Sequence, residues 1–195
     1  MLIYVHGFNS SALSHKAGLV RSRMAGLGRA AEFQCPELPH RPAQAIELLE
    51  RMVVAARPQR AALIGSSLGG YYAAWLVEKL GLRAVLVNPA VRPYELLRDA
   101  LGPQKNLYTG AAYDFTEGHL AELRALELPE VTPARYLLIA RTGDEVLDYR
   151  EAVRRYRGCE QIVDEGGDHG VGDFDRYLDR ALAFCGVAPR NPDSR

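Results

Sequence analysis

The stretch AALIGSSLGGYY (residues 61–72) decides the fold of this chain. Residues 62–64 are apolar and predict a short buried strand. Residues 72–80 are also largely apolar and predict a helix packed against a sheet. Only a few residues separate the two elements, so the chain must turn sharply from strand to helix.

Within that turn, Gly65 and Gly69 flank Ser67 in the pattern G-x-S-x-G. A strand that passes directly into a helix holds the central residue in a strained conformation, and flanking glycines let the helix approach the strand. A serine in this position presents its hydroxyl at the end of the sheet. Ser66 lies one residue too early for that geometry. We therefore expect Ser67 to be the candidate nucleophile and Gly65 and Gly69 to form its turn.

Short apolar runs alternate with helical patterns along most of the chain. Continuous apolar strands that alternate with helices predict a parallel sheet covered on both faces. The expected fold is therefore α/β, with three layers and six strands in a mainly parallel sheet. The strands are expected at residues 2–5, 31–34, 62–64, 84–87, 136–140 and 161–163, and Ser10 or Ser11 is expected to cap the first helix.

Residues 91–133 break this alternation, with short amphipathic pieces near 95–100 and 120–126. We expect a single domain over residues 1–195, in which 91–133 form a small helical cap insertion over the site. A polar tail that follows Gly186 is expected to fray. Six apolar and aromatic residues of the insertion could line an acyl pocket or serve only in packing: Tyr94, Leu97, Leu107, Tyr108, Tyr113 and Phe115.

Composition argues against several classes of protein. The 24 basic and 24 acidic residues balance, and no Lys/Arg block is present, so neither nucleic acid nor a membrane surface is an expected partner. The three cysteines show no CxxC spacing, which predicts free thiols and no metal site. The first residues, MLIYVHG, carry no basic leader, so we expect a cytoplasmic protein.

A serine nucleophile needs a base, and the base needs an orienting group. His169 follows the last strand in a glycine-rich loop and is the expected base. Asp144 follows the fifth strand and is the expected orienting carboxylate, with Asp148 as the second choice because it could instead cap a helix. The remaining candidate carboxylates are Glu145, Asp164 and Asp168. His6 is expected to be structural, and His15, His40 and His119 to be solvated.

The intermediate formed on an acylated serine requires N–H donors for its oxyanion. Leu68, directly after the nucleophile, and Phe8, in the loop after the first strand, are the expected backbone donors. The loop around Phe8 could also be an ordinary turn that leads into a helix.

Five motifs together resemble the α/β-hydrolase superfamily, and more closely its small YqiA/YcfP-like group of bacterial esterases. They are HGF (6–8), GSSLGGYYA (65–73), NPAVRPYELL (88–97), TGDEVLDY (142–149) and EGGDHG (165–170). The resemblance implies an esterase or thioesterase without a cofactor, with Ser67, Asp144 and His169 as its triad. It also implies a six-stranded sheet that lacks the superfamily's two leading antiparallel strands. Gly170 and Val171 stand where the group often has a small and then an aromatic residue, so we expect a loosely packed loop.

The leading interpretation is a serine esterase that hydrolyses small to medium acyl esters through an acyl-serine intermediate. One alternative is a hydrolase of acyl-CoA or other thioesters, which is less favoured because no basic cluster is evident for the CoA phosphates. Another is a non-catalytic binding protein on the same fold. The expected partner is a small-molecule acyl ester, whereas the oligomeric state is not predicted.

Overall fold

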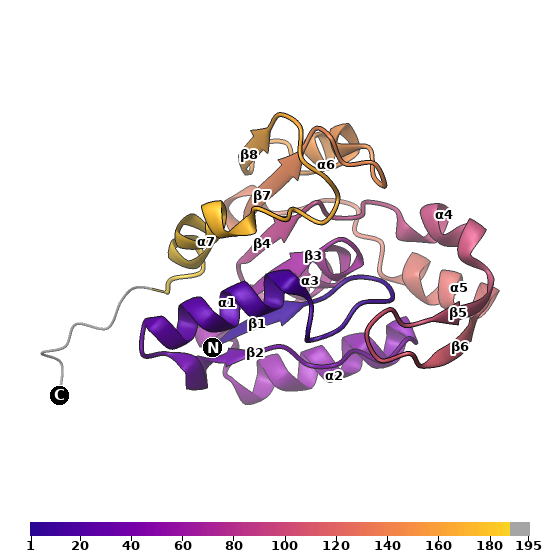
Figure 1. Cartoon of the computed structure of the whole chain (residues 1–195), viewed down its shortest axis with the longest axis horizontal. Coiled ribbons are helices and arrows are strands. Elements are labelled where there is room, and N and C mark those ends of the chain that lie inside the picture. The colour runs from indigo at the N-terminus through magenta and orange to yellow at the C-terminus, as the bar shows by residue number, and fades with distance from the viewer. Residues whose placement is uncertain (188–195) are drawn as a thin grey trace, which may run out of the picture.

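Six parallel strands form the centre of the protein (Figure 1), here a computed structural model that describes residues 1–187. Their order across the sheet is β2-β1-β3-β4-β7-β8. The strands are β1 (Leu2–Val5), β2 (Phe33–Gln34), β3 (Ala62–Ser66), β4 (Ala84–Val87), β7 (Tyr136–Arg141) and β8 (Glu160–Asp164). The prediction of a six-stranded parallel sheet is confirmed.

Helices cover both faces of the sheet (Figure 1). On one face, α1 (His15–Gly26) and α7 (Leu178–Phe184) contribute to the core cluster that contains Leu2 and Tyr4 of β1. On the other face, α2 (Pro42–Ala55), α3 (Leu68–Leu80) and α6 (Tyr149–Arg155) contribute to the core cluster that contains Ile3 and Val5. Successive residues of a strand point to opposite faces, so β1 contributes to both cores. This explains why the strands read as continuous apolar runs.

The chain reverses its direction across the sheet at β1. It passes from β1 to β2 on one side, then crosses over to β3 on the other side. Ligands of open parallel sheets bind beyond the carboxyl ends of the strands at such a reversal. Val5 is the register partner of Gly65, so the loops that begin at His6 and Ser67 emerge side by side.

Between β4 and β7 the chain leaves the sheet, as expected. This insertion contains α4 (Pro93–Leu96), a 3₁₀ turn (Leu97–Ala100), the antiparallel strands β5 (Gly102–Lys105) and β6 (Ala112–Phe115), and α5 (Glu117–Ala125). The short helices were predicted, and the β5–β6 hairpin was not. Its first strand, GPQK, has no apolar residue apart from proline, so it gives no strand signal.

Several boundaries differ from those expected. Ser14, rather than Ser10 or Ser11, stands at the N-cap of α1, while the Ser11 hydroxyl accepts a hydrogen bond from the Leu13 N–H at 2.9 Å. Helix α3 begins at Leu68, directly after the serine. Most of the tail expected to fray, residues 188–195, lies outside the described residues. Among the described helices, none combines the length and apolar character needed to cross a membrane.

Candidate active site

Ser67 lies at the abrupt passage from β3 to α3. Its φ is +54° and its ψ is −123°, a conformation that residues with a side chain rarely adopt. The turn is possible because the glycines leave no Cβ in the way. A Cβ at Gly69 would lie 2.0 Å from the Val5 carbonyl oxygen, and a Cβ at Gly65 would lie 2.5 Å from the Gly69 carbonyl oxygen. The two glycines thus occupy the close contact between helix and strand that the sequence predicted.

The structure places His169 against Asp144. The His169 Nδ1 lies 2.8 Å and 3.0 Å from the two carboxylate oxygens. The Asp144 side chain is 1% exposed and the His169 side chain 21% exposed. A carboxylate accepts hydrogen bonds, so it fixes the proton on Nδ1 and leaves Nε2 as an acceptor. A histidine in this state can take a proton from a hydroxyl.

Asp144 is held as an anion by its surroundings. Burial works against ionisation, but hydrogen bonds from His169 and from the backbone N–H groups of Leu147 and Val146 outweigh it and lower the pKa of Asp144. The Leu147 and Val146 N–H groups donate to Oδ1 at 2.8 Å and 2.9 Å. The carboxylate is therefore fixed in both charge and direction.

The second-choice carboxylate, Asp148, caps a helix and does not contact the His169 ring. It stands at the N-cap of α6 and accepts a hydrogen bond from the Arg150 N–H at 2.9 Å. Asp164 accepts a hydrogen bond from the Tyr177 hydroxyl at 2.6 Å. Of the carboxylates considered, only Asp144 contacts the His169 ring.

Asn88 links the segments that carry these groups, and the sequence did not single out its side chain. It is 3% exposed and has a φ of +39°. Its Nδ2 donates to the carbonyl oxygens of Asp168 (3.1 Å) and His169 (3.2 Å), while its Oδ1 accepts from the Arg141 N–H at 2.9 Å. One side chain thus joins the ends of β4 and β7 to the His169 loop. The only signal in the sequence is an Asn-Pro pair at a strand end.

The His169 loop has further anchors. The Glu145 carboxylate accepts a hydrogen bond from the His169 N–H at 2.9 Å. The buried Arg141 guanidinium pairs with Asp173 at 3.0 Å and donates to the Gly166 carbonyl at 3.2 Å. Val171 is 1% exposed and belongs to a core cluster. The expectation of a loosely packed loop was therefore wrong, because an aliphatic side chain fills the core at Val171.

The two segments that carry the expected oxyanion donors both adjoin Ser67. A Cβ at Gly7 would lie 3.1 Å from the Ser67 Cβ, so the loop after β1 runs directly beside the serine. Within residues 1–187, the backbone N–H groups of Phe8 and Leu68 have no hydrogen-bond acceptor. Leu68 opens α3, and N–H groups in the first turn of a helix are free to bind an anion.

His6 supports this loop, as the sequence suggested. Its ring is buried, and its Nε2 accepts a hydrogen bond from the Leu38 N–H at 3.1 Å. Burial lowers the pKa of His6. His15 and His40 are exposed, as expected, but His119 is 2% exposed and packs against Phe115 with ring centroids 4.8 Å apart. The expectation that His119 is solvated was wrong, because the unpredicted hairpin covers it.

Two cavities adjoin the loop after β1. One, of about 230 Å³, is lined by both Ser67 and His169, and Tyr108 of the hairpin lies on its wall. The other, of about 270 Å³, is lined by Leu68, Tyr72 and Tyr113. Both are lined by residues 6–8 and 10, so the loop after β1 separates them. Of the six insertion residues considered for an acyl pocket, Tyr108 and Tyr113 line these cavities, while Tyr94 and Phe115 are buried in the core.

The hairpin is tied to the loop after β1 rather than resting loosely on it. Asn9 donates to Gln104 at 2.9 Å and accepts from the Tyr113 hydroxyl at 2.7 Å. Asn106 donates to the Ser10 carbonyl at 2.8 Å, and the Leu107 N–H donates to the Asn9 carbonyl at 3.0 Å. These four hydrogen bonds fix the position of the loop that carries Phe8.

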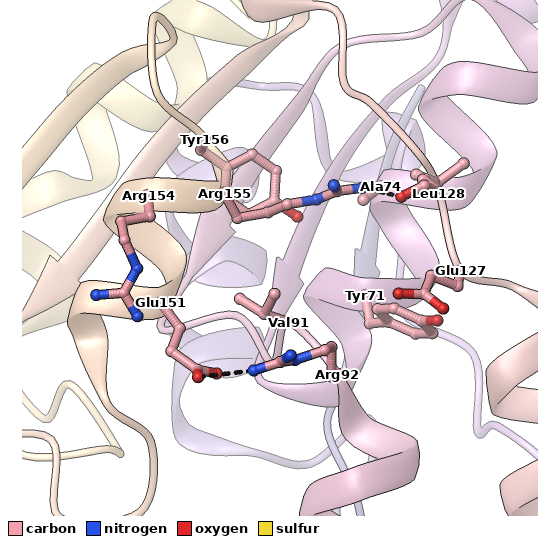
Figure 2. Close-up of a pocket in the computed structure, with 10 residues that line it drawn as sticks. All are labelled: Tyr71, Ala74, Val91, Arg92, Glu127, Leu128, Glu151, Arg154, Arg155 and Tyr156. Atoms are coloured by element: carbon pink, nitrogen blue, oxygen red, sulfur yellow. Dashed lines mark hydrogen bonds and ion pairs between the residues drawn. The ribbon is translucent and has the colours of Figure 1, made fainter.

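A further cavity of about 300 Å³ lies between α3, α6 and the two ends of the insertion (Figure 2). Three of its charged side chains bind partners within its wall. Arg92 binds Glu151 at 3.0 Å, and Arg155 donates to the Leu128 carbonyl. None of the expected site residues lines this cavity, so the candidate active site is the one at Ser67.

Known proteins resemble this chain over nearly all of its length. The protein YcfP of Salmonella paratyphi A is 23% identical over 186 residues, which are 94% of this chain and 98% of the relative. A solved structure from Agrobacterium vitis S4, provisionally named a hydrolase, matches with a TM-score of 0.74 and 19% identity over 94% of this chain and 87% of its own. An esterase domain from a Rhodothermus marinus protein matches with a TM-score of 0.67 and 15% identity, over 97% and 86% of the two chains.

At these identities the solved structures show the fold alone, and it is the α/β-hydrolase fold. The expected resemblance to the YcfP-like group is confirmed by the sequence relatives. The model of UPF0227, described as an uncharacterised protein family, matches residues 1–186. This chain therefore belongs to the UPF0227 family.

Proposed function

We propose that this protein is a carboxylic ester hydrolase that works through an acyl-serine intermediate. One observation carries the proposal: Ser67 is held at positive φ in the same cavity as a histidine that a buried carboxylate orients. A histidine oriented in this way is the partner that a serine hydroxyl needs to become a nucleophile. The structural likeness to an esterase domain agrees with this chemistry.

In the proposed reaction, the Ser67 oxygen attacks the ester carbonyl while His169 takes the hydroxyl proton at Nε2. The N–H groups of Phe8 and Leu68 donate hydrogen bonds to the oxyanion. The bond between the carbonyl carbon and the alcohol oxygen then breaks, and His169 returns the proton to that oxygen. Water repeats the sequence on the acyl-serine and releases the acid. Asp144 stabilises the imidazolium and does not itself take the proton.

The cavity lined by Leu68, Tyr72 and Tyr113 adjoins the oxyanion donors and would take the acyl chain. Its volume of about 270 Å³ suits a small to medium acyl group. A series of p-nitrophenyl esters of increasing chain length tests this assignment. We expect activity to rise with chain length and then to fall once the cavity is full.

A fluorophosphonate probe tests the nucleophile, because it labels only an activated serine. We expect a single adduct on Ser67, located by mass spectrometry, and no labelling of Ser67→Ala. The matched control is Ser66→Ala, which removes the neighbouring, buried hydroxyl and should leave the adduct on Ser67. An unlabelled wild-type protein would indicate a binding protein on this fold and would overturn the proposal.

A further inference from the structure

The cavity at Ser67 has a cation in its wall that the proposed reaction does not use. Lys16, in the first turn of α1, lines this cavity together with Ser67 and His169. Its ammonium donates a hydrogen bond to the Gly170 carbonyl, next to the base. An ammonium has three N–H donors, so two remain after this bond.

Lys16 has no direct counter-ion among residues 1–187. Within the part of the chain that the structure describes, no carboxylate forms an ion pair with it, and no Asp or Glu lines its cavity. Burial lowers the pKa of Lys16 to about 8, although the more distant carboxylates of Asp168 and Asp144 oppose this shift. A partly buried cation without a partner costs free energy. An anionic ligand that binds beside it would recover that cost.

A second feature of the same wall favours an anion. The Ser14 residue at the N-cap of α1 is 8% exposed and lines the cavity. Its Oγ makes no hydrogen bond of normal geometry among the described residues and has the Tyr4 hydroxyl as its polar neighbour. Helix α1 has twelve residues and no acidic residue in its first turn. Its N-terminal N–H groups therefore add positive potential to that of Lys16.

The chemistry of the reaction indicates which part of the substrate meets Lys16. The base must return its proton to the departing alcohol oxygen, so the alcohol leaves beside His169. His169, Gly170 and Lys16 line the same cavity, whereas the other cavity adjoins the oxyanion donors and would hold the acyl chain. The alcohol portion therefore lies on the side of Lys16.

We infer that the preferred substrates are esters of an alcohol that itself carries an anionic group, a carboxylate or a phosphate, which Lys16 binds. This inference rests on the proposed ester hydrolysis and names the class of its leaving group. Lys16 acts in it as a specificity residue, because it contacts the departing alcohol and not the reacting bond.

The test compares substrates that share the butanoyl group and differ in the charge of the alcohol. The substrates are 3- and 4-(butanoyloxy)benzoate, the two matching benzamides, and 4-(butanoyloxy)phenyl phosphate. For whichever of the two benzoates is hydrolysed faster, we expect kcat/KM to be about 10- to 100-fold higher than for the matching benzamide. This is the factor that one charge-assisted hydrogen bond supplies. The phosphate ester shows whether a carboxylate or a phosphate is preferred.

Variants of Lys16 assign the preference to its charge. Lys16→Met keeps an unbranched side chain of nearly the same length without the charge, and it should bring the ratio of kcat/KM for the charged and neutral substrates close to one. Lys16→Arg should keep part of the preference. Any general loss caused by a shift of the His169 loop affects both substrates and cancels in the ratio. Lys79→Met is the matched control, because Lys79 pairs with Glu50 far from the cavity. A wild-type ratio of one or less, or an unchanged ratio in Lys16→Met, would overturn the inference.

A binding measurement separates this inference from the proposed function. NMR titration of the Ser67→Ala variant with 3- and 4-hydroxybenzoate and the matching hydroxybenzamides requires no turnover. We expect the better benzoate to bind about tenfold or more tightly than its amide, and Lys16→Met to abolish the difference. Equal affinities refute the inference even where esters are hydrolysed. If the benzoate binds more tightly than the amide but the fluorophosphonate probe does not label Ser67, the proposed hydrolase function is refuted and only an anion-binding site remains.

Discussion

Replacement of Asn88 tests whether one buried amide holds the site together. In Asn88→Ala, the Arg141 N–H loses its acceptor inside the protein, which costs about 1–3 kcal/mol. The carbonyls of Asp168 and His169 each lose a donor, at about 0.5–1.5 kcal/mol apiece. Alanine at a φ of +39° adds about 1–2 kcal/mol of strain. We therefore expect the free energy of unfolding to fall by about 3–8 kcal/mol.

Asn88→Gly separates strain from hydrogen bonding. Glycine loses the same three hydrogen bonds, but it tolerates positive φ. We therefore expect Asn88→Gly to be about 1 kcal/mol more stable than Asn88→Ala, which reverses the usual order of the two residues. Urea denaturation followed by the fluorescence of the single tryptophan measures both variants. An alanine variant as stable as the glycine variant, or more so, would refute the reasoning about strain.

Activity gives the second readout for Asn88. The lost hydrogen bonds free the loop that carries His169, and misplacement of a reacting group by about 1 Å can cost about 100-fold in rate. We expect Asn88→Gly to lower kcat by about that factor with little change in KM, measured with a p-nitrophenyl ester at a temperature where the variant is folded. A folded Asn88→Gly variant with the kcat of the wild type would show that the amide does not position the base.

Two further predictions concern a carboxylate and a pair of glycines. The pKa of Asp144 lies below its usual value in the folded chain, so its stabilising contribution is present above the unfolded pKa of about 3.9 and is lost as the pH falls through the folded pKa. Urea denaturation at pH 5 and pH 3 should therefore show a larger loss of stability in the wild type than in Asp144→Asn, and equal losses would contradict the hydrogen bond to His169. Gly69→Ala places a Cβ 2.0 Å from the Val5 carbonyl oxygen and should cost at least about 3 kcal/mol of stability or prevent folding. Gly18→Ala, at a helix position with no atom within 4 Å of the new Cβ, should instead stabilise the protein by about 0.5–1 kcal/mol. Urea denaturation measures both variants, and similar effects of the two substitutions would refute the steric argument.

Much of the fold could be predicted because its strands are short, fully apolar and separated by helices. Each strand of the sheet was found within two residues of its position. Strand β2 contains only Phe33 and Gln34, since a 3₁₀ turn over Ala30–Glu32 takes up residues that read as the start of a strand. The strand propensities of these residues do not distinguish a 3₁₀ turn from an extended strand.

The triad candidates were visible in the sequence because each follows a strand, and the carboxyl ends of parallel strands lie at one edge. Asn88 and Arg141 could not be assigned in the same way. Their partners are carbonyls and carboxylates 25 to 81 residues away, which only the folded chain brings together. The burial of His119 was missed for a related reason, because it depends on a hairpin with no strand signal.

The hydrogen bonds between the β5–β6 hairpin and the loop after β1 also bear on the order of folding. They join residues 95 to 104 positions apart, and contacts of such separation form slowly because a long segment of chain must be closed first. The turn at Ser67, in contrast, depends on neighbouring residues and on adjacent strands. A chain that has formed its sheet but not its hairpin would present the serine without a fixed Phe8 N–H. We therefore expect the rate of acyl transfer to appear later in refolding than the native signal of the sheet.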